Sequence, residues 1–226
     1  MMATPLPPEL FPRDVSFHIE NVSRSGGVAT NGQEQVVGSA AGRWRARLTG
    51  CPVTTDEQIL AFRAWLFGMQ GRSGTTVVPV FGEKLRANWP VDPYGRRLSP
   101  AAVRRSRLDG TQFADPSLPD QSRIVEHVTA NVARRATTLP ISVTQGSAVR
   151  AGQYLSIGVN LYAITAVLSS SLVTIRPGLR MPVPAGTAIN FEAPACEMRL
   201  ASDDVGQLDL QLARWGFVDL DFVEAY

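Results

Sequence analysis

Hydrophobic and polar residues alternate most clearly between Arg43 and Leu48. Trp44, Ala46 and Leu48 fall on one side of this segment, and three arginines fall on the other. A period of two residues is typical of a β-strand with one buried face and one face towards solvent or a partner. The residues Gly50-Cys51-Pro52 follow, and they predict a turn that ends the strand.

A helix is predicted directly after this turn, over about residues 55–70. The run Thr54-Thr55-Asp56-Glu57 fits a capping box, in which a hydroxyl precedes a carboxylate by three residues. Gly71 and Gly74 follow and predict the end of the helix. One apolar stripe is predicted along this helix, because its residues are spaced three and four apart. They are Ile59, Phe62, Leu66 and Met69.

Shorter patterns flank this central unit. Val77–Phe81 is predicted to be a second strand, and Pro79 within it favours the edge of a sheet. Asp14–Val22 alternates and predicts another strand. The glycine- and serine-rich segment Ser23–Gly32 predicts a loop, and Gln33–Val37 predicts a short strand.

The C-terminal part repeats the alternating pattern three times, at 196–200, 208–212 and 218–222. Each segment is predicted to be an amphipathic strand. Because sequential strands often pair in antiparallel fashion, we expect these strands to complete the sheet begun by Val15–Ile19 and Arg43–Leu48.

Residues 137–192 are predicted to form a separate small barrel. Five short apolar runs recur there between turn signals, which favours a closed or nearly closed, OB-like β-barrel. The low charge of this segment indicates either that part of its surface is covered or that the surface is rich in uncharged polar residues. The five runs are Leu139–Val143, Tyr154–Ile157, Leu161–Val167, Leu172–Ile175 and Ala188–Phe191.

The predicted fold class is therefore mostly β. We expect a β-sandwich or split barrel with one packed helix, formed discontinuously by residues 1–136 and 193–226 and used for ring assembly. Residues 137–192 would be the inserted small OB-like β-barrel. The segment Ser122–Ala136 fits either a strand pair or a short helix, and its valines favour strands.

A long segment from Gly82 to Asp120 lacks any regular pattern and is rich in proline and arginine. Loops of this length are unusual inside a compact domain and are often functional. Three interpretations remain open: a solvated basic loop, a contact with neighbouring subunits, or a contact with phosphate or DNA. The candidate contact residues are Arg96, Arg97, Arg104 and Arg105.

Composition narrows the function classes only modestly. The chain has 226 residues and a net charge of +2, which is too small to indicate nucleic-acid binding. No basic region followed by an apolar run marks a signal peptide. No apolar run approaches the roughly 20 residues that span a bilayer. We therefore expect synthesis in the cytoplasm without membrane insertion.

No catalytic or metal-binding motif is present, so the chain is not expected to be an enzyme or to hold a cofactor or metal. His18 and His127 lack partners at a diagnostic spacing and are interpreted as structural or surface residues. Asp203-Asp204 is interpreted as part of a turn. Cys51 and Cys196 do not have metal-ligand spacing.

Three features resemble the distal tail and minor tail proteins of long-tailed bacteriophages and gene transfer agents. They are the tryptophan-bearing strand followed by the capped helix and the strand TTVVPVF, the barrel-like midsection 147–194, and the acidic-aromatic terminus WGFVDLDFVEAY. The resemblance implies a structural subunit of the tail tip. Such proteins form a ring, commonly a hexamer, that joins the tail tube to hub or tip proteins.

The resemblance also implies a location in the virion, after assembly in the host cytoplasm, and transient passage of DNA through the lumen of the ring. One relative of this kind is associated with an iron–sulfur cluster held by cysteines. Two cysteines cannot supply the four ligands of such a cluster from one chain, so no cofactor is expected here.

The sequence suggests two candidate subunit contacts. One is the strand face with Arg43, Arg45 and Arg47, because no helix or acidic run nearby is available to cover it. The other is the loop 83–120.

The alternative function is a carbohydrate- or receptor-binding module of the tail tip. Tyr154, Tyr162 and Phe191 are candidates for stacking on a ligand, although each also fits a core position in a strand. A hydrolase acting on cell-wall sugars or peptides is a third class, for which the sequence shows no constellation.

Overall fold

The chain forms two compact units, of which the first is discontinuous in sequence. They comprise Met1–Pro79 with Ala195–Tyr226, and Val80–Pro194. The computed structural model describes residues 3–8, 10–21, 23–28, 30–38, 41–80, 126–143, 149–191, 193–208, 210 and 215–226. These residues form mostly β-structure with one α-helix and a nearly closed barrel-like sheet, which confirms the predicted fold class.

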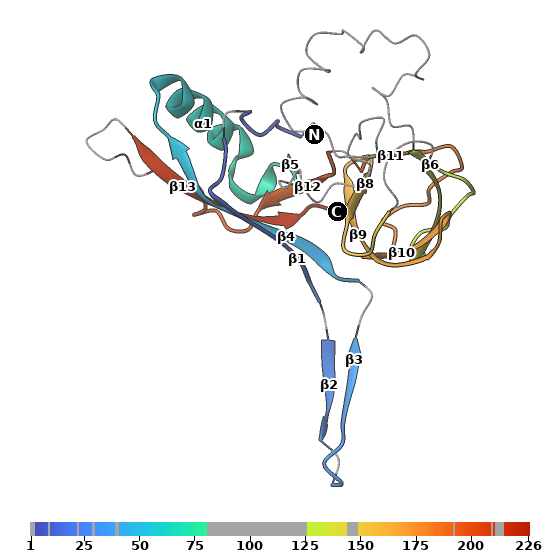
Figure 1. Cartoon of the computed structure of the whole chain (residues 1–226). Helices are drawn as coiled ribbons and strands as arrows, with labels where there is room; N and C mark the ends of the chain where they lie inside the picture. The colour runs from blue at the N-terminus through green and yellow to red at the C-terminus, as the bar shows by residue number, and fades with distance from the viewer. Residues whose placement is uncertain are drawn as a thin grey trace, which may run out of the picture. The chain divides into compact units, whose positions relative to one another are not determined.

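A five-stranded antiparallel sheet is the centre of the first unit (Figure 1). Its strands, in spatial order, are β1 (Asp14–Glu20), β4 (Arg43–Val53), β13 (Gly216–Glu224), β12 (Ala195–Leu200) and β5 (Thr76–Pro79). The prediction that early and late segments of the chain share one sheet is therefore confirmed. Pro79 lies in an edge strand, where its missing N–H costs no ladder bond.

Alternation along these strands separates a buried face from an outward face, as predicted. On β4, Trp44, Ala46 and Leu48 are buried. The matching buried residues of β12 and β13 are Cys196, Met198, Leu200, Val218, Leu220 and Phe222. The segment 208–212 was also predicted to be a strand, but its described residues Leu208 and Leu210 lie outside any strand.

Strand β4 does not end at the predicted turn but continues through Gly50 to Val53. Two β4 residues, Thr49 and Gly50, lie opposite the single β13 residue Asp219, which makes a β-bulge. Gly50 has a φ of +64°, and its N–H donates to Asp219 Oδ1 at 2.8 Å. The glycine that suggested a turn therefore permits a bulge within a continuous strand.

Helix α1 (Asp56–Met69) has the predicted capping box, shifted by one residue. Thr55 is the N-cap, and its side chain accepts from the Gln58 N–H while the Gln58 side chain returns to the Thr55 backbone. The buried stripe contains Trp65 in place of the predicted Leu66. The Trp65 ring lies 6.3 Å from that of Phe222, which packs the helix on the sheet.

The helix ends at Gln70, which adopts the left-handed conformation expected of a glycine (φ 51°, ψ 48°). A short 3₁₀ turn, η1 (Gly71–Ser73), follows. The Arg72 N–H donates to Asp203 Oδ1 at 2.9 Å, so Asp203 fixes this turn to the segment after β12. This contact gives Asp203 a structural role within the predicted turn.

A β-hairpin occupies the segment between β1 and β4 (Figure 1). It consists of β2 (Ser23–Val28) and β3 (Glu34–Gly38), which form their own two-stranded sheet. The predicted short strand is confirmed as β3. The prediction of a loop over Ser23–Gly32 is wrong for its first part, because pairing with β3 imposes a strand on residues of poor strand propensity.

A six-stranded antiparallel sheet forms the second unit. Its strands are β6 (Glu126–Val128), β7 (Thr138–Val143), β8 (Tyr154–Ile157), β9 (Asn160–Ser169), β10 (Leu172–Arg176) and β11 (Ala188–Ile189), in the order β11-β6-β7-β10-β9-β8. Ser156 and Asn190 exchange two backbone hydrogen bonds of 2.9 and 2.8 Å, which join β8 to the end of β11. The sheet thereby curls into a nearly closed barrel.

All five strands predicted for the barrel are present, and β6 is a sixth. An OB-fold has five strands, so this sheet has one more. The strand interpretation of Ser122–Ala136 is confirmed over Glu126–Val128. Because β6 pairs with β7 and β11, it belongs to the barrel unit, although it lies before the predicted barrel range 137–192.

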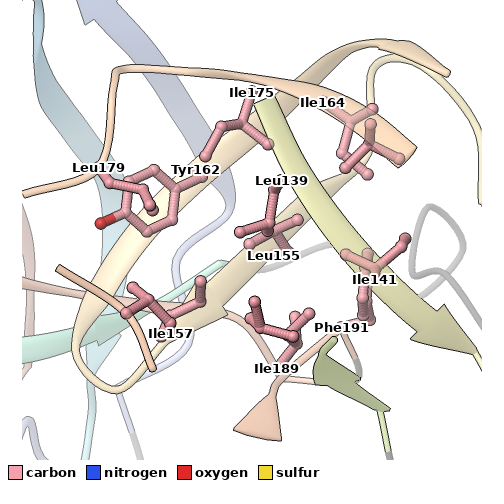
Figure 2. Close-up of a cluster of buried hydrophobic side chains, with 13 residues drawn as sticks. Leu139, Ile141, Leu155, Ile157, Tyr162, Ile164, Ile175, Leu179, Ile189 and Phe191 are labelled. Carbon is pink, nitrogen blue, oxygen red and sulfur yellow. The ribbon is translucent and has the colours of Figure 1, made fainter. Parts of the chain in front are cut away.

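The barrel interior is filled by branched aliphatic side chains and two aromatic rings (Figure 2). Leu139 and Ile141 of β7, Leu155 of β8 and Val173 of β10 are fully buried. Burial of apolar surface on this scale is the main term that stabilises a small domain. The barrel is therefore a packed core.

Candidate interaction surfaces

Arg43, Arg45 and Arg47 lie together on the outward face of β4, as their alternation predicted. Arg43 Nε lies 3.2 Å from Glu20 Oε2, and Arg45 Nε lies 3.0 Å from the same oxygen. Arg47 Nε lies 3.4 Å from Asp221 Oδ1. The arginines therefore form ion pairs with both neighbouring strands.

The sequence shows no acidic run near this face, but two acids from the neighbouring strands lie against it. Glu20 lies directly opposite Arg43 on β1, and Asp221 lies directly opposite Arg47 on β13. Hydrogen bonds from Arg45 and then Arg43 lower the pKa of Glu20. These acids are distant from the arginines in sequence, and only the strand register brings them together.

On the outward face of β4, three arginines thus pair with two carboxylates. Exposed ion pairs of this kind contribute little to stability, because water screens the charges. A role of this face between subunits remains a prediction. The other arginine candidates, Arg96, Arg97, Arg104 and Arg105, lie outside the described residues.

Both strands of the β2–β3 hairpin are exposed. Every residue of both strands is exposed, including Val28 (70%), Val36 (56%) and Val37 (63%). Ser25 Oγ donates to Glu34 Oε1 across the hairpin. A two-stranded sheet is marginally stable in water by itself. The three exposed valines of this hairpin form an apolar surface that a partner can cover.

The outward side of α1 carries a second apolar stripe. Leu60 and Phe67 are 65% and 75% exposed. With Ala64 between them they follow the i, i+4, i+7 spacing of one helix face. A helix with apolar residues on two sides is usually covered by other structure on both sides. The five-stranded sheet covers one side of α1, and the side with Leu60 and Phe67 is exposed.

A smaller aromatic cluster lies where the N-terminal segment meets β13. The guanidinium carbon of Arg13 lies 4.5 Å above the centre of the Phe217 ring, and the Trp215 ring stands edge-on to that ring at 5.8 Å. Both aromatic side chains are more than one-third exposed. The cluster offers apolar ring surface beside a cation.

The tyrosine candidates for ligand stacking differ in their surroundings. Tyr162 is fully buried in the barrel, where its hydroxyl accepts from the Arg180 N–H at 3.1 Å. A buried ring cannot stack on a ligand, so Tyr162 is a core residue, as is Phe191. Tyr154 is half-buried, and its role as a stacking residue remains a prediction.

The remaining reactive side chains do not assemble into a site. His18 is exposed on β1, and His127 is half-buried on β6. Cys51 and Cys196 are both buried, and burial raises the pKa of the Cys51 thiol to about 11. Within the described part of the chain, no group of three or more metal-ligating side chains gathers.

One buried carboxyl group stands apart from these surfaces. Glu126 is 1% exposed and shares the inward face of β6 with the core residue Val128. Its Oε1 has no hydrogen-bond partner among the described residues, and burial raises the pKa of the carboxyl group to about 8. Sequence pattern gave no signal for this group, because glutamate in a short alternating run usually faces solvent.

Among the described residues, no helix is both long and apolar enough to cross a membrane. Comparison with known proteins adds no assignment: no protein-family model matches the chain, and no curated protein matches it significantly. Function is therefore inferred from the surfaces described above.

Proposed function

We propose that this chain is a structural subunit of a bacteriophage tail tip, a distal tail protein whose copies form a hexameric ring. The ring would join the tail tube to hub or tip proteins. The observation that carries the proposal is the fully exposed β2–β3 hairpin with its three valines. The features that resemble tail proteins support the same role.

The hairpin suits assembly because no other described strand of its own chain pairs with it. Its strands pair only with each other, as a separate two-stranded sheet. Contact with another chain would remove the valines from water, at roughly 25 cal/mol per Å² of buried apolar surface. The hairpin follows β1 and precedes β4, so a rigid sheet anchors both of its ends.

The outward stripe of α1 is a second apolar surface at a different place on the same unit. A chain with two different complementary surfaces assembles head to tail, and such contacts close into rings when the rotation permits. In the proposed assembly, the tube protein and the hub proteins bind the two sides of the ring. DNA passes through its lumen, and the protein is located in the virion.

The proposal is tested by the mass of the purified protein in solution. We expect the wild-type chain to elute as an oligomer, measured by size-exclusion chromatography with light scattering. A variant with residues 24–37 replaced by a short Gly-Ser linker is expected to be monomeric. Its circular dichroism should retain the β-signal, because the hairpin residues are all exposed. Equal masses for both proteins would contradict the proposal.

The Arg13–Phe217–Trp215 cluster favours a second candidate function, binding of a carbohydrate receptor by the tail tip. Exposed aromatic rings beside a polar group are suited to stack on a sugar ring. We expect Trp215→Ala to weaken binding at least tenfold on a glycan array if this function holds. Absence of glycan binding by the wild-type protein would exclude it.

A further inference from the structure

We infer that the hairpin of one protomer binds the outward face of α1 on a second copy of this chain, with Glu34 facing Arg63. The inference rests on the proposed function, since it requires that copies assemble, and it names the two surfaces that meet. Each surface is exposed on its own chain: Val36 is 56% exposed and Phe67 is 75% exposed.

The register of the hairpin places an acid beside two valines on one face. Val28 pairs with Glu34, and Ser25 pairs with Val36. Paired residues share a face, and Glu34 and Val36 are two positions apart on the same strand, so they also share it. We call Ser25, Val28, Glu34 and Val36 the acidic hairpin face. Arg24 pairs with Val37 on the opposite face.

The helix presents the complementary arrangement. Leu60, Arg63, Ala64 and Phe67 follow the spacing of one helix face, which we call the α1 outer face. Arg63 is exposed and is the one charged side chain of α1 after its first turn. Leu60 and Phe67 flank it, so a base lies between two large apolar groups.

The dimensions of the two faces agree. Residues two apart on a strand are separated by about 7 Å, and paired residues by about 5 Å, so the two valines flank Glu34 at short range. Leu60 and Phe67 are separated by about 10 Å along the helix axis, with Arg63 between them. A valine can therefore lie against each large apolar side chain while the opposite charges meet.

Two other exposed surfaces fit the acidic hairpin face less well. The arginines of β4 already form ion pairs with Glu20 and Asp221. The barrel strand β9 exposes Val167 and Leu168, but it contains no charged residue to receive Glu34. The contact is between two different surfaces, so each protomer offers one to each neighbour, as a ring requires.

A disulfide between introduced cysteines tests the contact. Protein with Val36→Cys is mixed with protein carrying Phe67→Cys and oxidised gently, and dimers are counted on a non-reducing gel. Because both native cysteines are buried, they will not compete with the introduced thiols. We expect a covalent dimer in the mixture that exceeds the dimer formed by either variant alone by at least about fivefold.

Two matched controls use other exposed apolar positions. Val37→Cys lies on the opposite hairpin face, and Leu168→Cys lies on the barrel. In one control mixture Val37→Cys replaces Val36→Cys, and in the other Leu168→Cys replaces Phe67→Cys. Each control mixture should give little dimer. Equal cross-linking at the control positions would overturn the inference, whereas selective cross-linking of Val36→Cys with Phe67→Cys would support it.

Charge reversal gives a second measurement on otherwise intact surfaces. Glu34→Arg and Arg63→Glu should each raise the dissociation constant of the oligomer about tenfold, and the double variant should recover most of the loss. If the wild-type protein forms a ring but neither reversal weakens it and no selective cross-link appears, the inference fails while the proposed function stands. If wild-type chains do not self-associate, both fail.

Discussion

Replacing Trp44 with alanine should lower the free energy of unfolding of the first unit by about 3–5 kcal/mol. Trp44 is 2% exposed on the inner face of β4, between β1 and β13. Its backbone N–H donates to the buried Glu224 carboxylate at 2.8 Å. Removal of the indole would leave a cavity where the early and late parts of the chain meet. Denaturant unfolding followed by intrinsic tryptophan fluorescence, to which Trp65 contributes, measures the loss.

Trp215→Ala is the matched control, since it deletes the same side chain from an exposed site at the start of β13. Its effect on the same unfolding transition should be within about 1 kcal/mol. If the two variants lowered the free energy of unfolding by similar amounts, burial of Trp44 in the sheet would not account for the stability of the first unit.

Replacing Glu126 with glutamine should stabilise the barrel at alkaline pH by about 2–4 kcal/mol. Burial raises the pKa of this carboxyl group to about 8 in the folded chain, from an ordinary value of 4.5. The folded state therefore binds more protons than the unfolded state between these values. The stability that the protonated form contributes is fully present below pH 4.5 and is lost as the pH rises through 8.

Glutamine does not titrate, so the difference in stability between Glu126→Gln and wild type should grow from about pH 5 to pH 8 and then level off. Amide hydrogen exchange of peptides from β9 and β10 reports the opening of the barrel itself. Glu20→Gln is the control, because the pKa of Glu20 is lowered and its removal should have a small effect of opposite sign. A pH-independent difference for Glu126→Gln would contradict the assigned burial.

Alternation predicted most of the fold because burial imposes the same period on every strand of one sheet. Trp44 with Leu48, and Val218 with Phe222, were placed on the inner face before any pairing was known, and all are buried. The barrel strands were found for a related reason, since turn residues separate short apolar runs. Gly50 misled the prediction because a positive φ serves a bulge as well as a turn.

The surfaces were harder to predict because they depend on residues that only pairing brings together. Glu20 and Asp221 reach the arginines of β4 from strands 23 and 174 residues away in sequence, counted from Arg43 and Arg47. The hairpin was missed in part because its first strand contains serine and glycine. From the sequence, Tyr162 fits both a core position in a strand and a residue that stacks on a ligand. Its complete burial in the structure shows that it is a core residue.

The proposed function requires that copies of this chain assemble into a closed ring. Negative-stain images of the purified wild-type protein test it most directly. We expect class averages of a closed ring with a central lumen, and loss of these particles in the variant without residues 24–37. Uniform monomers for the wild-type protein at tens of micromolar concentration would contradict it.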